Sequence, residues 1–374
     1  MRAIISGGGT GGHIFPAIAI ANKIKEQEPE SDILFVGALG KMEMQKVPQA
    51  GYKIVGLPIA GFQRKKLWKN ITLPLKMFVS SRKAKKIIKN FKPDIVIGVG
   101  GYASWATLKQ AQSLGVPTLL QEQNSLAGKS NQILGTKAQK ICVAYDGMDK
   151  FFQKDKIVFT GNPVRKNISH MQENRELLKQ EAIKEFNLNA TKRTILVTGG
   201  SLGAGTINRS IENALQYFID NDIQLLWQTG KYYYNGIIER TKQLFATNNK
   251  AKELIHIHEF IFEMDKAYSI CDVVVARAGA LSISELCLVG KPVILVPSPN
   301  VAEDHQTKNA MAIVNHNAAI MIKDAELQDR LIPVVGNLIK DNERMQTLGN
   351  NILKLGIKDA DQKIFQQIKT IVTK

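Results

Sequence analysis

A glycine-rich loop between an apolar run and a helical pattern constrains this chain more than any other feature. The run Ala3–Ile5 enters the loop Gly7–Gly12, and a pattern typical of a helix follows from Pro16. Glycines let the backbone turn tightly, and the helix start behind them offers free N–H groups to an anion. The loop lacks the Gly-Lys-Ser/Thr of a Walker loop. It predicts a phosphate or diphosphate site at residues 7–13, with a plain tight turn as the alternative.

The same order of strand, loop and helix returns at Thr194–Thr198, Gly199–Ala204 and Ile207–Phe218. Apolar runs that alternate with helical patterns are typical of parallel sheets covered on both faces. A chain of 374 residues is also too long for one ordinary core. We therefore expect an α/β fold of two doubly wound, Rossmann-like domains that face a deep cleft. The domains are expected at 1–162 and 163–355, with a C-terminal helix at about 356–374 able to pack back on the first.

Further polar segments follow the expected strands of the first domain. Gly100 and Gly101 come after the apolar run at 93–99, and Glu122–Asn124 comes after the run at 116–120. The carboxyl ends of parallel strands share one edge of the sheet, which is where such sheets bind ligands. We therefore expect both glycine loops and Glu122–Asn124 to converge on one crevice.

A second anion site is predicted where the helix Ala280–Leu288 follows the strand at 273–275. Glu285 lies about one turn into that helix and could accept hydrogen bonds from ribose hydroxyls. The alternative is a carboxylate that only complements the helix dipole. Further along, Gln306 could bind a sugar, whereas His305 is expected at the surface.

The chain gives little indication of a metal or cofactor site. Its three cysteines form no CxxC pair and read as buried thiols in a reducing cytoplasm. Only His256 and His258 are closely spaced, and they would alternate along a strand. The Asp-x-Asp runs at 220–222 and 359–361 fit caps or turns. We expect no tightly bound cofactor and no metal ligand. A soluble divalent cation is an alternative that the sequence leaves open but does not indicate. Without a fixed metal, a leaving diphosphate would depend on helix starts and on Arg or Lys.

The net charge of +17 is concentrated in one stretch, since residues 44–93 hold thirteen Lys or Arg and no Asp or Glu. Nucleic acid, an anionic membrane surface or phosphorylated substrates could explain it, and a solvated basic surface is the alternative. Within residues 64–92 an apolar helical face is expected, flanked by Lys76, Arg82, Lys83 and Lys86. That face comprises Ile71, Leu75, Phe78 and Val79. It fits a helix lying in a membrane interface, or one that packs on its own sheet. No apolar run is long enough to span a bilayer, and the N-terminus does not have a signal-peptide pattern.

Six motifs in order resemble those of the MurG family, the bacterial N-acetylglucosaminyltransferases that convert lipid I into lipid II. They are Gly8–Ala17, Gly100–Ser104, Gln121–Asn124, Gly161–Arg165, Gly199–Ala204 and Gly279–Glu285. The set spans nearly the whole chain, so it is specific although each motif alone is weak. The resemblance implies a GT-B fold and an inverting transfer of N-acetylglucosamine from its UDP donor to the 4-hydroxyl of the muramoyl sugar.

The resemblance also implies a donor site. It maps onto Thr10, Gly11, Gly12, Asn124, Arg165, Ser201, Ile261, Ala280, Leu281, Ser282, Glu285 and Gln306. In the family pattern the Ile261 backbone holds uracil and Glu285 holds the ribose. Ser201 and the helix start at Ala280 hold the diphosphate, while Asn124 and Gln306 contact the transferred sugar.

The remaining matched positions lie on the acceptor side or in other motifs. Gly8, Gly9, Tyr102 and Asn131 match the acceptor side, and Asn208 and Arg277 match further motif positions. The chain departs from many members in having Gln121 where they have His, so no titratable side chain is available there. His13 is therefore the first candidate for the general base and Glu122 the second. As the alternative, His13 only caps its loop or binds the acceptor diphosphate.

The implied partners are UDP-N-acetylglucosamine, lipid I and an anionic membrane, with the enzyme peripheral on the cytoplasmic face. Another GT-B enzyme that glycosylates a lipid such as diacylglycerol is the first alternative. A nucleic-acid-binding protein is the second, but it leaves the glycine loops unexplained, and aromatic residues for base stacking are sparse in the basic stretch. We therefore expect no nucleic-acid partner.

Overall fold

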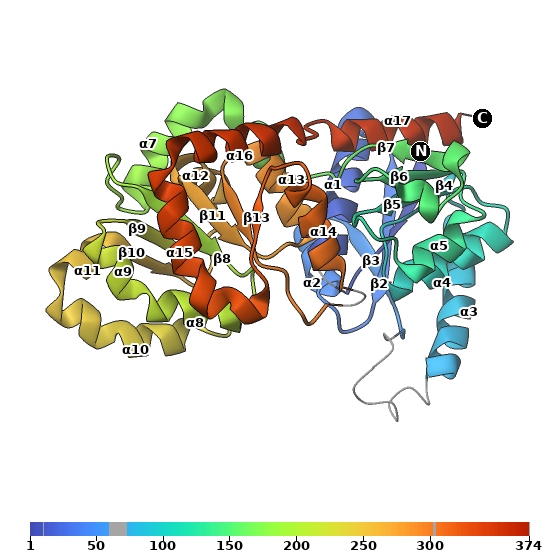
Figure 1. Ribbon diagram of the computed structural model, residues 1–374. Coiled ribbons are helices and arrows are strands. Elements are labelled where there is room, and N and C mark those ends of the chain that lie inside the picture. The colour runs from blue at the N-terminus through green and yellow to red at the C-terminus, as the bar shows by residue number, and fades with distance from the viewer. Residues whose placement is uncertain (10, 60–72, 302–303, 374) are drawn as a thin grey trace. The chain divides into compact units, whose positions relative to one another are not determined.

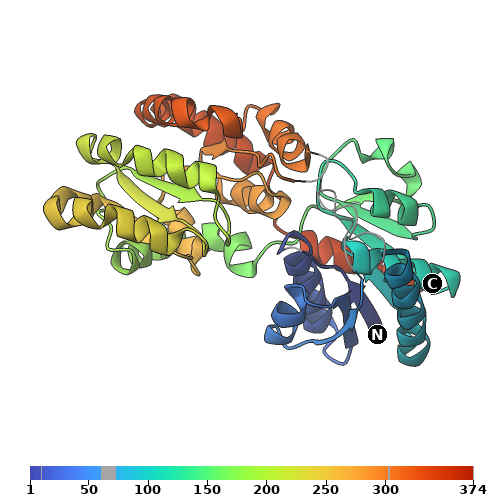
Figure 2. The same ribbon diagram turned by 90° about the horizontal axis from the view of Figure 1, so that it is seen from below.

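The computed structural model describes residues 1–9, 11–59, 73–301 and 304–373, which fall into two compact units. The first unit is Met1–Val164 with Asp359–Lys374, and the second is Arg165–Lys358. Each unit holds a parallel sheet with helices packed on both faces (Figures 1 and 2). The predicted α/β class with two doubly wound sheets is confirmed.

The described residues of the first unit form a seven-stranded sheet in the order β3-β2-β1-β4-β5-β6-β7. Its strands are β1 (Arg2–Ser6), β2 (Asp32–Ala38), β3 (Lys53–Leu57), β4 (Ile95–Gly98), β5 (Thr118–Glu122), β6 (Lys140–Val143) and β7 (Ile157–Phe159). Its helices include α1 (Gly11–Gln27), α2 (Glu43–Gln49), α3 (Leu73–Phe91), α4 (Tyr102–Ser113), α5 (Lys129–Gly135) and α17 (Ala360–Val372). The strand order reverses between β1 and β4, where sheets of this kind form a ligand crevice.

Alternation along β1 explains why both faces of this sheet are covered. Ile5 packs with Ile14 of α1 and Ile368 of α17, whereas Ile4 faces the other way and packs with Ile88 of α3. Successive side chains of a strand point to opposite faces, so an uninterrupted apolar strand needs helices on both.

The last helix, α17, belongs to the first unit and packs along α1 (Figure 1). Ile364, Phe365 and Ile368 are buried in the first unit's core. The Lys369 ammonium pairs with the carboxylate of Glu28, which follows α1 directly. Residues 359–374 therefore complete a core that begins with β1.

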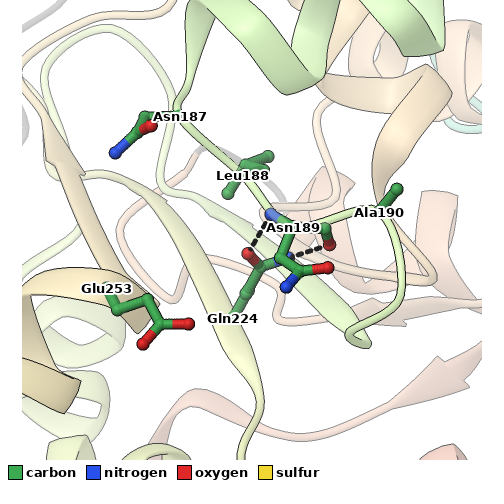
Figure 3. Close-up of a pocket in the computed structure, with 6 residues that line it drawn as sticks. All are labelled: Asn187, Leu188, Asn189, Ala190, Gln224 and Glu253. Atoms are coloured by element: carbon green, nitrogen blue, oxygen red, sulfur yellow. Dashed lines mark hydrogen bonds between the residues drawn. The ribbon is translucent and has the colours of Figure 1, made fainter.

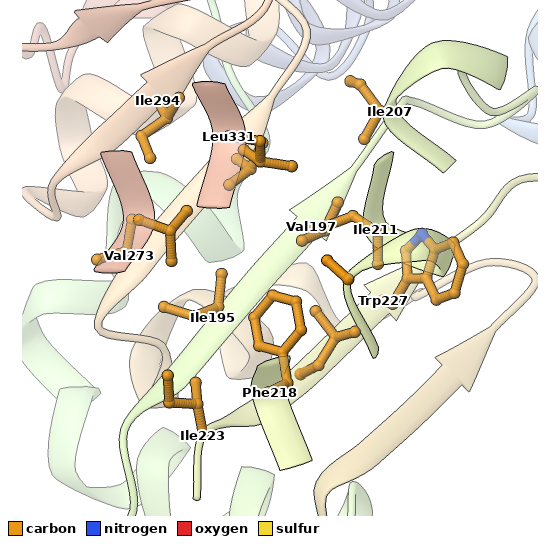
Figure 4. Packing of buried hydrophobic residues seen from close by; sticks show 14 of the residues in the cluster. Ile195, Val197, Ile207, Ile211, Phe218, Ile223, Trp227, Val273, Ile294 and Leu331 are labelled. Atoms are coloured by element: carbon orange, nitrogen blue, oxygen red, sulfur yellow. The ribbon is translucent and has the colours of Figure 1, made fainter. Parts of the chain in front are cut away.

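The described residues of the second unit form a six-stranded sheet in the order β10-β9-β8-β11-β12-β13. Its strands are β8 (Thr194–Thr198), β9 (Gln224–Gln228), β10 (Ile255–His258), β11 (Val273–Ala276), β12 (Val293–Leu295) and β13 (Ile320–Met321). Its helices include α6 (Lys166–Ser169), α7 (Arg175–Glu185), α8 (Gly205–Asn213), α9 (Leu215–Asp220), α10 (Tyr234–Thr247), α11 (Asn249–Leu254), α12 (Met264–Ile270), α13 (Ala280–Val289), α14 (His305–Val314), α15 (Leu327–Lys340) and α16 (Asn342–Lys354). Here the order reverses between β8 and β11. On one face, Ile195 and Val197 of β8 pack with Phe218 and Leu331 (Figure 4).

Two helices differ from the sequence prediction. The first helix begins at Gly11 and not at Pro16. Glycine is a weak helix former, so the apolar pattern alone places the start of α1 too late in the sequence. In the structure, burial of Ile14 against the sheet stabilises the first turn of the helix. The helix predicted at 207–218 is broken at Ala214 into α8 and α9.

Candidate active site

Two glycine loops meet at the carboxyl ends of β1 and β4. A Cβ added at Gly101 would lie 2.7 Å from the Gly8 carbonyl oxygen, and one added at Gly7 would lie 2.1 Å from Cγ2 of Val99. Gly101 also has a φ of +91°, which residues with a side chain rarely adopt. The close approach of these two loops therefore depends on glycine at each contact.

His13 lies in the first turn of α1, facing the second glycine loop. Its Nδ1 is 3.0 Å from the Gly8 carbonyl oxygen. Because a carbonyl can only accept, this contact places the ring proton on Nδ1 and leaves the Nε2 lone pair available. A Cβ added at Gly100 would lie 3.0 Å from Nε2. The imidazole thus has the tautomer that a general base requires.

Glu43 of α2 shapes the first glycine loop, and the sequence motifs do not single it out. The residue is only 1% exposed. Its carboxylate accepts the N–H of Gly9 at 2.9 Å and the N–H of Ala38 at 3.0 Å. One signal was available in the sequence, since Glu43 directly precedes the long basic stretch without any acidic residue.

Glu122, at the end of β5, is buried and holds the segment that follows it. One carboxylate oxygen accepts the backbone N–H of Asn124 at 3.1 Å and its side-chain amide at 3.2 Å. The other accepts the Gly128 N–H at 3.1 Å and the Asn131 amide at 2.8 Å. A carboxylate that accepts four N–H donors is well suited to ordering a loop.

A buried polar network surrounds Gln121, the position where the chain departs from the family pattern. Gln121 donates to Oδ1 of Asn162 at 2.8 Å, and Asn162 donates to the Gln123 carbonyl at 3.0 Å. Gln123 in turn donates to the carbonyl of Val99 at 2.9 Å. These amides tie β5 to β4 and to the segment that leads out of the first unit.

The other predicted residues of the first unit lie at the same edge of the sheet. Gly11 and Gly12 form the first turn of α1, and Gly9 precedes it with a φ of +92°. Tyr102 begins α4 and is 48% exposed. Thr10 lies outside the described residues.

In the second unit, α13 begins directly beyond the carboxyl end of β11. By helix geometry, the N–H groups of Ala280, Leu281 and Ser282 receive no carbonyl from within the helix. The residue before the helix, Gly279, has no side chain with which to cap this start. These N–H groups and the helix dipole suit an anion.

Arg165 and Glu285 form a two-bond fork in the second unit. Nε of Arg165 donates to Oε1 of Glu285 at 2.8 Å and Nη2 donates to Oε2 at 3.0 Å. Burial disfavours the charged guanidinium and so lowers the pKa of Arg165. The hydrogen bonds to Glu285 outweigh this effect and raise the pKa above its ordinary value. The carboxylate expected to bind ribose is therefore already engaged by a residue predicted for the same site.

The loop that carries Ser201 follows β8 and packs on the loop that follows β9. A Cβ added at Gly203 would lie 2.1 Å from the Thr229 carbonyl oxygen. The Ser201 carbonyl accepts the Lys231 N–H at 3.2 Å, and Ser201 itself is exposed. This glycine loop thus holds Ser201 outward at the carboxyl end of β8.

Gln228 holds the segment that contains Ile261, and the sequence motifs did not single it out as a site residue. Its side-chain oxygen accepts the Ile261 N–H at 2.9 Å, and its amide donates to Thr198 Oγ1 at 3.0 Å. Gln228 is the last residue of β9 and follows the apolar run Leu225–Trp227. A polar residue at the end of a buried strand was the signal in the sequence that could have identified it. The Ile261 N–H is thus used internally, beside the exposed rings of Phe260 and Phe262.

Asn208 and Arg277 both act as internal clamps. Asn208 is buried, donates to the Thr229 carbonyl at 2.8 Å and accepts from Trp227 Nε1 at 3.0 Å. Arg277 pairs with Asp324, donates to the Val296 carbonyl at 3.1 Å and reaches Thr206 at 2.9 Å. They fix the loops after β9, β11 and β12.

Gln306 lies in the first turn of α14 and accepts the Ser298 N–H at 2.8 Å through its side-chain oxygen. This bond leaves the Gln306 side-chain amide as the group able to donate to a sugar hydroxyl. The neighbouring His305 begins α14 and is half-buried.

The described residues include no group of three His, Cys, Asp or Glu side chains arranged to hold a metal ion. Asp222 pairs with Lys192 at 2.9 Å and Asp361 with Lys23 at 3.2 Å, so both Asp-x-Asp runs supply ion pairs. Burial lowers the pKa of both His256 and His258.

A polar pocket of the second unit lies elsewhere, at the amino ends of β8 and β9 (Figure 3). Two of its lining residues are joined directly, because Gln224 accepts the Asn189 N–H at 2.6 Å and donates to the Asn189 carbonyl at 2.9 Å. Parallel sheets bind ligands at the opposite edge, so we assign this pocket no part in the site.

The helix α3 presents an apolar face that its own unit does not cover. Leu75, Phe78 and Val79 are 66%, 54% and 44% exposed, whereas Ala84 and Ile88 are buried on the opposite face. Arg82 lies over the Phe78 ring at 4.5 Å from its centroid. The interpretation that this face packs on its own sheet is wrong for these three residues, while Ile71 and Trp68 lie outside the described residues. Within the described part, no helix combines the length and apolarity that a bilayer span requires.

Comparison with known proteins agrees with this architecture. The N-terminal domain of glycosyltransferase family 28 matches residues 3–143, and its C-terminal domain matches residues 194–364. A crystal structure of MurG from Acinetobacter baumannii is 25% identical, with a TM-score of 0.77 over 99% of each chain.

Two relatives are similar over nearly their full lengths. One, from Bacteroides thetaiotaomicron, is 55% identical over 98% of this chain and 97% of its own. The other, from Parabacteroides distasonis, is 54% identical over 100% of this chain and 99% of its own. Both are named UDP-N-acetylglucosamine–N-acetylmuramyl-(pentapeptide) pyrophosphoryl-undecaprenol N-acetylglucosamine transferase.

Proposed function

Because this chain belongs to glycosyltransferase family 28, and within it to the MurG enzymes, we infer that it converts lipid I into lipid II for peptidoglycan synthesis. It is a hexosyltransferase of the GT-B fold that moves N-acetylglucosamine from UDP-N-acetylglucosamine to the muramoyl 4-hydroxyl, with inversion. The near-full-length identity to relatives named for this activity carries the inference.

We propose that His13 is the general base of this transfer. The acceptor oxygen attacks C1 of the donor sugar, the bond from C1 to the UDP oxygen breaks, and the hydroxyl proton moves to Nε2 of His13. The hydrogen bond to Gly8 supports this role, because it keeps the other ring proton on Nδ1. Glu122 is the weaker candidate, because its oxygens already hold the loop to Asn131.

The proposed donor site uses the second unit's helix start and its flanking loops. N–H groups at Ala280–Ser282, with Ser201, would receive the diphosphate and stabilise the charge that develops as UDP leaves. Glu285 would accept the ribose hydroxyls, in competition with Arg165. The Ile261 backbone would hold uracil, with its carbonyl available beside an N–H already bound to Gln228.

We propose further that α3 attaches the enzyme to the anionic cytoplasmic face of the membrane. Its acceptor carries a polyprenyl chain, so the enzyme must work at a bilayer surface. Exposed Leu75, Phe78 and Val79, flanked by Arg82 and other cations, match a helix that lies in the interface.

The test is incubation of the purified chain with UDP-N-acetylglucosamine and a lipid I analogue. We expect a disaccharide product and UDP in equal amounts. Diacylglycerol in place of the lipid I analogue is the control, and a preference for diacylglycerol would contradict the assigned acceptor.

A further inference from the structure

We propose that Glu43 is a positioning residue that acts on His13 through a single peptide group. The Glu43 carboxylate accepts the Gly9 N–H at 2.9 Å. The Gly8 carbonyl belongs to the same peptide unit and faces Nδ1 of His13 at 3.0 Å. Carboxylate, peptide and imidazole therefore form one continuous hydrogen-bonded line. This inference rests on the proposed role of His13 as the base.

The surroundings hold the Glu43 carboxylate in a fixed position. Its second oxygen accepts the Ala38 N–H at 3.0 Å, and the residue is 1% exposed. A Cβ added at Gly8 would lie 2.1 Å from Oε1, and one added at Gly37 would lie 2.6 Å from Cγ. The backbone at both glycines thus closes around the carboxyl group, which cannot turn to another partner without moving these loops.

Such a line has a direct chemical consequence. Hydrogen bonds in a chain polarise one another, so a peptide that donates to an anion becomes a stronger acceptor at its carbonyl. The Gly8 oxygen then favours the proton on Nδ1 and fixes the plane of the ring. When Nε2 takes the acceptor's proton, the negative charge of Glu43 stabilises the imidazolium.

In this proposal no proton is transferred to Glu43. In hydrolase triads a carboxylate performs this task in direct contact with histidine. Here one peptide group, that of Gly8 and Gly9, lies between the carboxylate and the imidazole.

The test compares Glu43→Gln, His13→Gln and the double variant with the unchanged enzyme. An amide at position 43 keeps the shape but loses the charge and one of its two backbone bonds. We expect kcat to fall about 10- to 100-fold, as for carboxylates that orient ligand histidines, with KM for UDP-N-acetylglucosamine within about twofold. In the His13→Gln background the same change should cost less than about twofold, because residues that act as a unit are not additive.

A spectroscopic measurement separates positioning from simple stability. With ¹⁵N-labelled histidine, the His13 ring should carry its proton on Nδ1 in the unchanged enzyme and become a mixture of tautomers in Glu43→Gln. The matched control is Asp272→Asn in the second unit, where Asp272 accepts the Thr194 N–H at 2.8 Å. That variant should lower thermal stability and leave the His13 spectrum unchanged. Should Glu43→Gln not fold, Glu43→Asp retains the charge and should retain the tautomer.

Two results would overturn the proposal. One is an equal loss of kcat from Glu43→Gln with and without His13. The other is a His13 proton on Nε2 in the unchanged enzyme. A fully active His13→Gln would instead reject His13 as the base, and the ring spectra would still report whether Glu43 sets the tautomer, so the two failures are distinguishable.

Discussion

Single residues at the carboxyl edges of the two sheets divide into those that order loops and those that we propose to face a ligand. Glu43, Glu122 and Asn208 use their polar atoms on neighbouring backbone and amide groups. His13 keeps Nε2 beside Gly100, and Ser201 is exposed on its loop. Substitution of the first kind should disturb loops, and substitution of the second kind should disturb binding or chemistry alone.

His13→Gln is expected to lower kcat by about 10²- to 10⁴-fold, the usual contribution of a general base. Donor affinity should stay within about twofold by calorimetry, because we propose that His13 acts on the acceptor and not on UDP. Turnover within a few-fold of the unchanged enzyme would point to Glu122, to be tested next with Glu122→Gln.

Glu285→Gln is expected to weaken UDP binding about 10- to 100-fold, since charge-assisted hydrogen bonds to the ribose would be lost. Isothermal titration with UDP measures it. Glu212→Gln is the matched control, because Glu212 forms the same kind of fork with Arg240, at 2.6 and 2.9 Å. Equal UDP affinity in both variants would remove Glu285 from the donor site.

Motifs could place candidate residues at the right edges of both sheets, because glycine loops and helix starts leave clear marks in a sequence. They could not show that Glu285 is engaged by Arg165, since the two residues are far apart in the chain. Gln228 and Glu43 were missed for the same reason, as each acts on backbone groups of a distant loop.

At the scale of elements, α3 shows what amphipathic patterning can and cannot determine. The pattern identified Leu75, Phe78 and Val79 as one face, but only the structure shows that the opposite face, with Ala84 and Ile88, is the one that packs. Because only the stripe with Ala84 and Ile88 packs on the first unit, the stripe with Leu75, Phe78 and Val79 is available to a partner outside it.

Arg82, Lys85 and Lys86 changed together to Gln should weaken binding to anionic vesicles about 100-fold, at about 1 kcal/mol for each charge. Lys83 is left unchanged, because it donates to the Gly56 carbonyl at 2.8 Å. Vesicle sedimentation measures binding, and turnover of a short-chain soluble acceptor should stay nearly intact.

The charge-matched control changes Lys242, Lys340 and Lys354, three exposed lysines of the second unit. It should leave vesicle binding close to that of the unchanged enzyme. Equal losses in the two triple variants would show a general charge effect and contradict attachment through α3.

The contact between α17 and α1 should be sensitive to acid. The hydrogen bond from Lys369 lowers the pKa of Glu28 below its ordinary value of 4.5, against an opposing effect of desolvation. The pair therefore stabilises the fold above the unfolded pKa, and this contribution is lost as pH falls through the lower folded value. Lys369→Met should thus reduce the melting temperature at pH 7 more than at pH 3. An equal reduction of the melting temperature at pH 7 and at pH 3 would contradict this pH dependence.

For the whole molecule, the alternation of apolar runs and glycine loops was enough to predict two doubly wound sheets. The strands β6, β7 and β13 were missed. Their place is set by pairing with longer neighbours, which is a long-range property.

UDP should protect the second unit alone in hydrogen exchange. A ligand that binds only one folded unit stabilises it, by about 2.7 kcal/mol at 100 times its Kd. We expect slower exchange in 194–204 and 277–289, and unchanged exchange in β1 and β4. Protection confined to the first unit would contradict the placement of the donor.

The return of α17 to the first unit has a consequence for synthesis on the ribosome. N-terminal domains usually fold first as a chain emerges. Here β1 and α1 lack Ile364, Phe365 and Ile368 until residues 359–374 have been made. The second unit, continuous from Arg165 to Lys358, is therefore the first that can complete its core. The apolar side chains of β1 and α1 that α17 will cover therefore stay without this cover while the second unit is being translated.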